Sequence, residues 1–409
     1  MDLEEIAAKL QESRPPVLAG ADRFASIRQR RADDSALAQL CAWVKQVADV
    51  ALDQPPSERE MEGRRLLGVS REALKRVLSL AFAYRIDGDA RHLGRAREEL
   101  LAVAAFSDWN PDHFLDVGEM AAAVAIGLDW LRDDLVDADQ RALEEALIRH
   151  ALQPVYGGER DGPRFWWETT KNNWNSVCYA GLVMAAVAVA PREPTLGATA
   201  ISAAIRENPR ALGEYAPDGV YPEGTAYWNY GTSFQVLLID ALRAALGDDF
   251  GLAGAPGFAE SANFMLHATG PSGRNFNFAD ASERPDADWP LVWFARENDR
   301  PELARLAYER AAQRGGVPSD RLLAMAALWW PDHDKATDAS DPPLAWAGRG
   351  KVPVVAMRTA WNDPNAAYLA AVGGPASANH NHMDAGSFVY ERGGVRWAID
   401  LGLQSYHSL

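Results

Sequence analysis

The sequence predicts a mainly α-helical protein, built as a toroid or curved array of antiparallel helical hairpins and followed by the start of an antiparallel β-sandwich domain. Between residues 35 and 330, apolar residues recur at spacings of three and four, as on one face of a helix. Short polar, Gly or Pro breaks separate these segments, which favours antiparallel neighbours. After residue 350, short runs of β-branched and small residues replace the helical pattern.

The helical pattern predicts a series of similar segments that must bury their apolar faces against one another. Ser70 and Asp137 are suitable N-caps for two of them, because their side chains can accept bonds from free first-turn amides. We expect helices at residues 35–52, 70–84, 90–106, 116–135, 137–155, 175–190, 195–215, 225–246, 259–268, 286–298, 301–314 and 319–329.

Two domains are expected in a chain of 409 residues, because this length exceeds that of most single domains. The Pro- and Asp-rich stretch at 331–350 marks the boundary, so we assign residues 1–335 to the helical domain and 336–409 to the sheet domain. Strands are expected at 352–358, 367–372, 387–391 and 395–400. Four or five strands do not easily complete a sandwich, so the second domain looks truncated.

Charge and composition narrow the function classes. A net charge of -16 argues against nucleic-acid and anionic-membrane partners, although arginines gathered in a cleft would still permit an acidic sugar. The longest apolar run falls short of the ~20 residues that span a bilayer, and the acidic N-terminus lacks signal-peptide features, so we expect a cytoplasmic protein. Cys41 and Cys178 lie in apolar segments and are interpreted as buried residues. The sequence leaves the oligomeric state open.

His380 and His382 lie two residues apart, just before a predicted strand. Alternate side chains of a strand share a face, so we expect both histidines to point the same way. One could bind a metal while the other faces substrate, and Asp400 offers either an oxygen ligand or a carboxylate that orients a metal-bound histidine. Two surface histidines at a sheet edge are the commoner interpretation, by about two to one.

Asparagines and aromatic residues cluster in two further segments. Asn172, Asn173 and Asn175 precede the most apolar helix; we expect Asn173 or Asn175 to cap it and the others to supply amide donors. Trp174 lies among them, and sugar stacking and core packing are about equally frequent roles for such a tryptophan.

The second segment leads into the helix expected at 225–246. Tyr227 and Tyr230 lie one turn apart on the same helix face. Packing is the commoner role of such tyrosines, by about two to one, yet with Trp228 and Glu223 they are typical of the wall of a sugar cleft.

Two arginines complete the candidate substrate-binding residues. Arg274 lies in a loop between helices and Arg358 lies early in the sheet region. Either could clamp a carboxylate through two parallel hydrogen bonds, although a surface ion pair is the commoner use of an arginine.

Three segments together, residues 172–175, 221–231 and 379–388 followed by 397–402, resemble the heparinase II/III-like and oligoalginate lyase families. The resemblance implies an incomplete α/α toroid followed by an antiparallel β-sandwich, with the active site between them. It also implies β-elimination of a uronic-acid-containing polysaccharide, alginate- or glycosaminoglycan-like, that leaves an unsaturated uronate end.

The resemblance further implies roles for individual residues. An asparagine of the 172–175 segment and His380 would neutralise the uronate carboxylate or handle protons, and Tyr230 or Tyr227 would be the general acid and could also be the base. His382 and Asp400 match a zinc site. One imidazole and one carboxylate are too few ligands for zinc, and His407 has no evident partner, so we expect zinc to bind weakly or not at all.

Two alternatives remain open. Helical toroids also host inverting glycoside hydrolases, for which Glu223, Asp280 and Glu168 could supply the two carboxyl groups. A non-catalytic sugar-binding protein is the other. Ultraviolet absorbance separates the three, because only elimination creates a conjugated double bond.

Overall fold

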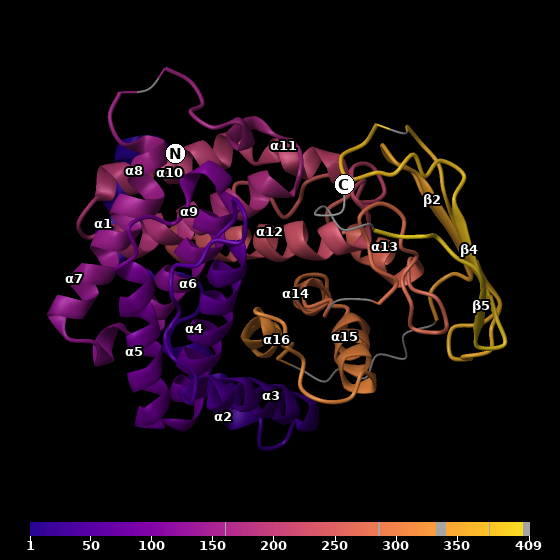
Figure 1. Ribbon diagram of the computed structural model, residues 1–409, viewed down its shortest axis with the longest axis horizontal. Helices are drawn as coiled ribbons and strands as arrows, with labels where there is room; N and C mark the ends of the chain where they lie inside the picture. Colours follow the sequence, from indigo (N-terminus) through magenta and orange to yellow (C-terminus); the bar gives the residue numbers. More distant parts are fainter. Residues whose placement is uncertain (160, 285–286, 333–340, 376, 404–409) are drawn as a thin grey trace.

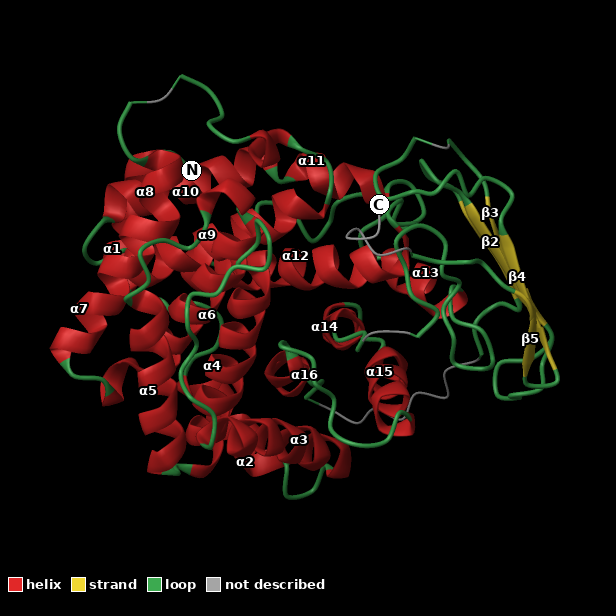
Figure 2. Ribbon diagram, in the orientation of Figure 1, coloured by secondary structure: helices red, strands yellow, loops and turns green. Residues whose placement is uncertain are grey.

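The computed structural model describes the chain except at residues 160, 285–286, 333–340, 376 and 404–409. Helices make up most of the molecule and a five-stranded sheet lies at one side (Figure 1, Figure 2), as the sequence predicted. The α-helices are α1 (Leu3–Ser13), α2 (Ala21–Arg30), α3 (Ser35–Leu52), α4 (Leu67–Asp87), α5 (Ala90–Ala104), α6 (Leu115–Leu131), α7 (Asp137–Ala146), α8 (Gln153–Tyr156), α9 (Asn173–Val189), α10 (Pro194–Glu207), α11 (Pro209–Leu212), α12 (Gly224–Leu246), α13 (Ser261–His267), α14 (Pro290–Glu297), α15 (Pro301–Gln313) and α16 (Leu323–Trp329). Shorter helical turns are η1 (Pro111–His113), η2 (Arg132–Asp134), η3 (Leu147–Leu152), η4 (Trp166–Thr169) and η5 (Gly213–Tyr215).

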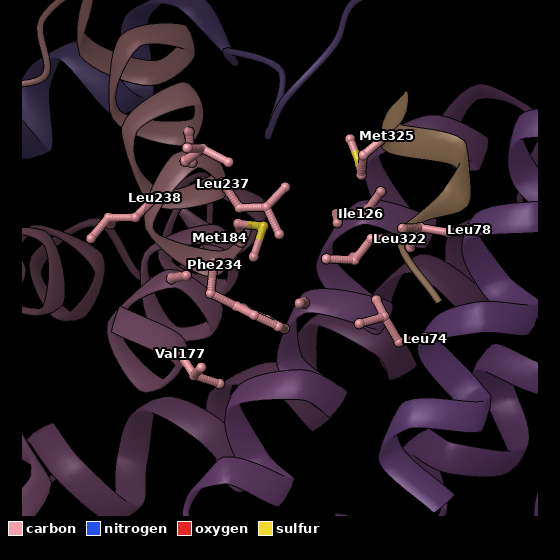
Figure 3. Packing of buried hydrophobic residues seen from close by; sticks show 14 of the residues in the cluster. Leu74, Leu78, Ile126, Val177, Met184, Phe234, Leu237, Leu238, Leu322 and Met325 are labelled. Atoms are coloured by element: carbon pink, nitrogen blue, oxygen red, sulfur yellow. The ribbon is translucent and has the colours of Figure 1, made fainter. Parts of the chain in front are cut away.

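Helices α4, α6, α9 and α12 form the centre of the helical region, where α6 packs against both α4 and α9, and α9 packs against α12. Figure 3 shows Leu74 of α4, Met184 of α9 and Phe234 of α12 within this core. Each buried side chain of this size contributes about 1.5–3 kcal/mol relative to leaving it in water. Helices α6 and α9 approach closely because Gly118 and Gly181 face each other; a Cβ at Gly181 would collide with the Gly118 carbonyl oxygen.

The sheet is an antiparallel meander whose strands follow one another in chain order: β1 (Ala345–Gly348), β2 (Val354–Arg358), β3 (Tyr368–Val372), β4 (Phe388–Arg392) and β5 (Val395–Ala398). Arg358 pairs with Tyr368 in the register of β2 and β3. The Tyr368 hydroxyl donates to the His267 carbonyl oxygen at 2.8 Å. One face of the sheet therefore contacts the end of α13.

Most predicted elements are present with shifted ends. The prediction for α3 is correct at both ends, whereas α1, α2 and β1 were not predicted. Both predicted caps are wrong: Ser70 is buried inside α4, and α7 begins at Asp137 itself after Val136. Sequence patterns predict the location of a helix more accurately than the residue at which it begins, because tertiary contacts extend or shorten its ends.

The remaining predictions about organisation have different outcomes. Cys41 and Cys178 are buried free thiols, as expected. Within the described ranges, no helix combines the length and the apolar character needed to cross a membrane. The predicted domain boundary at residue 335 lies outside the described residues.

Candidate functional site

A cleft of about 520 Å³ opens where the first turns of α4 and α12, the segment before α6 and the loop before β4 meet. Its volume is in the range of ligand-binding pockets. The side chains that line it are mostly polar or aromatic: Arg65, Leu67, Arg71, His113, Leu115, Trp174, Ala226, Tyr227, Asn229, Tyr230, Ser233, Asp280, Asp320, Arg321, Leu322, His380 and Leu403. Four residues predicted for the site, Trp174, Tyr227, Tyr230 and His380, are thus brought together.

We call residues 379–384 the histidine loop; it is folded back onto the helical region. The backbone amide of Asp280 donates to the His380 carbonyl oxygen at 3.0 Å, and the Asn381 side chain donates to the Pro222 carbonyl oxygen at 2.9 Å. His380 and Met383 have positive φ angles of 59° and 63°. The loop is therefore not a strand, and the expectation that His380 and His382 share a strand face is wrong.

A buried carboxylate holds His380. His380 Nδ1 lies 2.6 Å from Oε2 of Glu223, whose side chain is only 3% exposed. Asn379 Nδ2 donates to the same oxygen at 2.8 Å. A carboxylate accepts hydrogen bonds, so Nδ1 of the ring is the donor and, in the neutral ring, Nε2 keeps its lone pair. This arrangement prepares Nε2 to accept a proton.

Tyr227 lies directly against this histidine. The two rings are nearly parallel, with centroids 3.7 Å apart and an interplanar angle of 6°. Tyr227 is half-buried in the first turns of α12 and lines the cleft. A hydroxyl-bearing ring and a proton-accepting ring therefore stand side by side.

Tyr230, one turn further along α12, lies close to two guanidinium groups. Arg71 and Arg321 stand 4.9 and 5.1 Å from the centroid of its ring, and both pair with Glu119, at 2.9 and 2.5 Å. Burial and the Glu119 carboxylate raise the pKa of Tyr230 well above its ordinary value. Burial alone would raise the pKa of Glu119, but Arg321 and Arg71 outweigh it and hold that pKa below its usual value. Tyr230 thus keeps its proton.

A second carboxylate-bound histidine lines the same cleft. His113 Nδ1, at the end of η1, lies 2.6 Å from Oδ1 of Asp116, which is fully buried. The His113 ring meets Trp174 edge to face at 4.8 Å. Nδ1 therefore donates to Asp116, and Nε2 is the nitrogen left for a ligand: it accepts in the neutral ring and donates in the imidazolium.

The three asparagines of the 172–175 segment have separate positions. Asn172 caps α9, because its side chain accepts from the Trp174 amide at 3.2 Å; the expectation that Asn173 or Asn175 is the cap is wrong. Asn175 is fully buried and donates to the Glu168 carbonyl oxygen at 3.1 Å, which leaves it no contact with substrate.

Asn173 is buried directly behind Gly231 of α12. Its backbone amide donates to Oε1 of Glu223 at 3.3 Å, the carboxylate that holds His380. Among the described residues, neither polar atom of its side chain has a hydrogen-bond partner. An unsatisfied buried amide costs about 1–3 kcal/mol, so this side chain would gain from a ligand that reached it.

Of the six predicted substrate-binding residues, Trp174 lines the cleft and five do not: Asn172 and Glu223, whose positions are given above, and Trp228, Arg274 and Arg358. Trp228 is fully buried beside Phe294 and cannot stack on a sugar. Arg358 is the last residue of β2, and its buried side chain donates to the Thr269 carbonyl oxygen at 2.8 Å. Burial lowers its pKa to about 10. Arg274 is half-exposed and pairs with Glu283 at 3.4 Å, away from the lining residues. For these three residues the side-chain type predicted contact with substrate, but burial of Trp228 and Arg358 and the position of Arg274 do not allow it.

The residues assigned to zinc do not form a ligand set in the described part of the chain. His382 Nε2 lies 2.6 Å from Asp280 Oδ1, whereas the Asp400 carboxylate accepts from Ser387 Oγ at 2.5 Å. Within the described ranges, no group of three or more His, Cys, Asp or Glu side chains could hold a metal. His407 lies outside these ranges. The side chains that are described therefore do not fit a zinc site.

The carboxylates proposed for a hydrolase are also poorly placed. Glu168 is 2% exposed and accepts from the backbone amides of Arg164 and Phe165 at 2.6 and 2.9 Å. Glu223 is engaged by His380, as described above. Asp280 alone of the three lines the cleft. A pair of free carboxyl groups across a sugar is therefore not present among these residues.

The sequence reasoning missed several residues of the cleft. Arg65, Arg71, His113 and Arg321 come from segments that no motif connects, and their roles appear only when the helices pack. Asn229 lies inside a recognised motif, and its side-chain oxygen, buried at the cleft, has no described partner. Asn229 could have been predicted because it lies in the segment 221–231. For the other four residues, the only indication in the sequence was the residue type.

Comparisons with known proteins bear on the fold. No family model and no curated protein sequence matches the chain. The chain is similar to the chondroitin AC lyase of Streptomyces coelicolor A3, solved with chondroitin sulphate: 15% identity, TM-score 0.51, 92% of this chain and 58% of that one. It is similar to an alginate lyase from Bacteroides ovatus: 13% identity, TM-score 0.50, 76% of this chain and 98% of that one.

A mutant of the heparan sulfate lyase from Pedobacter heparinus is 15% identical, with a TM-score of 0.48, over 89% of this chain and 56% of that one. The chain spans little more than half the length of this lyase and of the chondroitin lyase. The likeness to the chondroitin and alginate lyases shows that the chain has the α/α toroid fold of polysaccharide lyases. The fold relation that the three sequence segments predicted is confirmed.

Proposed function

We propose that this protein is a polysaccharide lyase that cleaves a uronic-acid-containing oligo- or polysaccharide, alginate- or glycosaminoglycan-like, by β-elimination. One observation carries the proposal: His380, fixed by the buried Glu223, stands ring to ring with Tyr227 in a cleft that arginines line. The fold shared with solved lyases that act on acidic polysaccharides supports it.

The chemistry requires three kinds of group. Removing the proton from C5 of a uronate is difficult, because the negative charge develops beside a carboxylate that is already anionic. Hydrogen-bond donors and cations placed at that carboxylate stabilise the intermediate, as in an oxyanion hole. A base must also reach C5, and an acid must reach the glycosidic oxygen.

The cleft offers a candidate for each. Nε2 of His380 accepts the C5 proton while Glu223 stabilises the resulting imidazolium. The electrons of the C5–H bond form the C4–C5 double bond as the C4–O bond breaks, and a tyrosine proton passes to the departing oxygen. Tyr227 and Tyr230 are the candidate acids; Tyr230 has the hydroxyl whose raised pKa keeps it protonated. Arg71 and Arg321 line the cleft as donors to the substrate carboxylate.

A panel of acidic polysaccharides and their short oligomers tests the proposal. We expect ultraviolet absorbance from the new conjugated double bond with at least one uronate substrate, and no reaction with neutral glucans, whose C5 lacks an acidifying carboxylate. Reducing ends without absorbance would instead indicate a hydrolase. Binding without either product would indicate a sugar-binding protein.

A further inference from the structure

Asp116 organises one wall of the cleft. This fully buried carboxylate accepts three hydrogen bonds: from His113 Nδ1 at 2.6 Å, from the Leu66 backbone amide at 2.6 Å and from Asn110 Nδ2 at 2.7 Å. Hydrogen bonds to a charged group are stronger than those between neutral groups, so this arrangement fixes His113 firmly. It also fixes the backbone immediately after Arg65.

Arg65 itself lies in a turn tied to the same centre. Its backbone pairs with Glu62 across the turn, and Asn110 Nδ2 also donates to the Arg64 carbonyl oxygen at 2.9 Å. The Arg65 side chain is exposed and lines the cleft. Unlike Arg71, which pairs with Glu119, it has no ion pair with any carboxylate in the described part of the chain.

An aromatic surface adjoins these two groups. Trp174 meets His113 edge to face. Trp166, which is 59% exposed, packs against Trp174 with the two ring centroids 4.8 Å apart. Aromatic faces of this kind suit the apolar face of a sugar ring. A cation, an imidazole nitrogen and an aromatic face thus meet on one wall, and the reaction centre of His380 and Tyr227 belongs to other elements.

We propose that Arg65 and His113 form an anion-binding subsite that takes the carboxylate of a second uronate residue, next to the one that undergoes elimination. Arg65 is exposed at the cleft, whereas the groups assigned to the reaction are half-buried or fully buried, so Arg65 meets a part of the sugar chain further from the bond that breaks. Asp116 is the positioning residue for both. This subsite rests on the proposed function for its ligand class.

The experiment measures binding separately from turnover. Titration calorimetry uses saturated mannuronate oligomers of one and three residues, a heparosan tetrasaccharide and neutral mannotriose. We expect Arg65→Gln and His113→Gln each to weaken binding of an acidic oligomer at least about tenfold, because the first removes the guanidinium and the second removes the Nε2–H of the imidazolium, each a charged donor to the bound carboxylate. Binding of the single-residue uronate should be unchanged, and Arg65→Lys should restore part of the loss.

Arg64→Gln is the matched control, because Arg64 is the exposed neighbour that does not line the cleft. Thermal unfolding checks that each variant is folded. Unchanged affinity in both Arg65→Gln and His113→Gln overturns the subsite, as does failure of the wild type to bind either acidic oligomer. If binding depends on Arg65 and His113 but no substrate gives absorbance, the subsite stands and the lyase function fails. If a substrate gives absorbance but neither substitution changes binding, the lyase function stands and the subsite fails.

Discussion

The two walls of the cleft pair a histidine with a carboxylate in different ways. On the histidine-loop wall, His380 and Glu223 are separated by 157 positions in the chain. On the helical wall, His113 and Asp116 are three positions apart. The first pair exists only when the loop before β4 has folded back onto α12, whereas the second is built within η1 and the start of α6.

The two walls therefore depend to different degrees on long-range folding of the chain. The long-range pair couples the proposed base to correct docking of the sheet region on the helices, so the reaction centre is complete only in the fully folded chain. The local pair can orient a substrate-binding group as soon as the helices form. Substitutions on the first wall should therefore affect turnover, and substitutions on the second should affect binding.

The largest effect is expected at His380. His380→Gln removes the proposed base while the Glu223 carboxylate stays, and we expect turnover of the uronate substrate to fall by about 10³-fold, in the range typical of acid–base groups. Ultraviolet absorbance under substrate saturation measures it. His92→Gln is the control, because His92 pairs with Asp49 at 2.9 Å outside the cleft. Equal turnover by His380→Gln and wild type would remove this histidine from the mechanism.

The tyrosines should give the next largest effect. Tyr227→Phe and Tyr230→Phe each remove one hydroxyl, and we expect turnover to fall at least ~100-fold at one position, because only one group donates to the leaving oxygen. The same absorbance assay identifies which. Tyr84→Phe, which removes a hydroxyl that donates to Asp134 at 2.8 Å far from the lining residues, should leave turnover unchanged. Wild-type rates in both cleft variants would refute the assignment.

On the helical wall, loss of the Glu119 carboxylate should affect the stability of the fold. Glu119→Gln leaves Arg71 and Arg321 together without their shared carboxylate, and we expect the free energy of unfolding to fall by about 3 kcal/mol at neutral pH. The pKa of Glu119 is lowered in the folded state, so its contribution is fully present above the ordinary carboxyl pKa and is lost as pH falls from there through the lowered pKa of the folded state. Urea unfolding at several pH values measures the difference.

The matched control for that change is Glu144→Gln. Glu144 also lies between two arginines, Arg132 at 2.9 Å and Arg192 at 3.6 Å, but outside the cleft. Both variants should lose stability, and Glu119→Gln alone should also change turnover, because its carboxylate contacts the guanidinium groups around Tyr230. A wild-type pH dependence of stability in Glu119→Gln would show that another group is responsible.

Zinc should give the smallest effect. The chain offers His382 and Asp400 to the predicted site, fewer ligands than the three or four that zinc sites use. We expect elemental analysis after dialysis to find well under one zinc per chain, and a chelator to leave turnover unchanged. Stoichiometric zinc that is lost in His382→Gln would contradict this and would require a further ligand.

Contiguous patterns allowed much of the fold and part of the site to be predicted. The 3.6-residue periodicity is a local property, so it located helices such as α3 and α12 without any knowledge of their neighbours. The segments around Tyr227 and His380 were identified for the same reason, because the residues that mark them are adjacent in the chain. The fold predicted from these patterns is the one that the solved lyases share.

Local sequence patterns therefore predicted most of the helices and strands in their order, and the segments that carry Tyr227, Tyr230 and His380. The packing of the chain buries Trp228, Asn175 and Arg358, and it brings Arg65, Arg71, His113 and Arg321 to one cleft; no local pattern predicted either result. The physical reason is that burial and long-range pairing depend on which faces meet when helices pack. A pair such as His380 and Glu223 has no local pattern to reveal it, because its energy is gained only on docking.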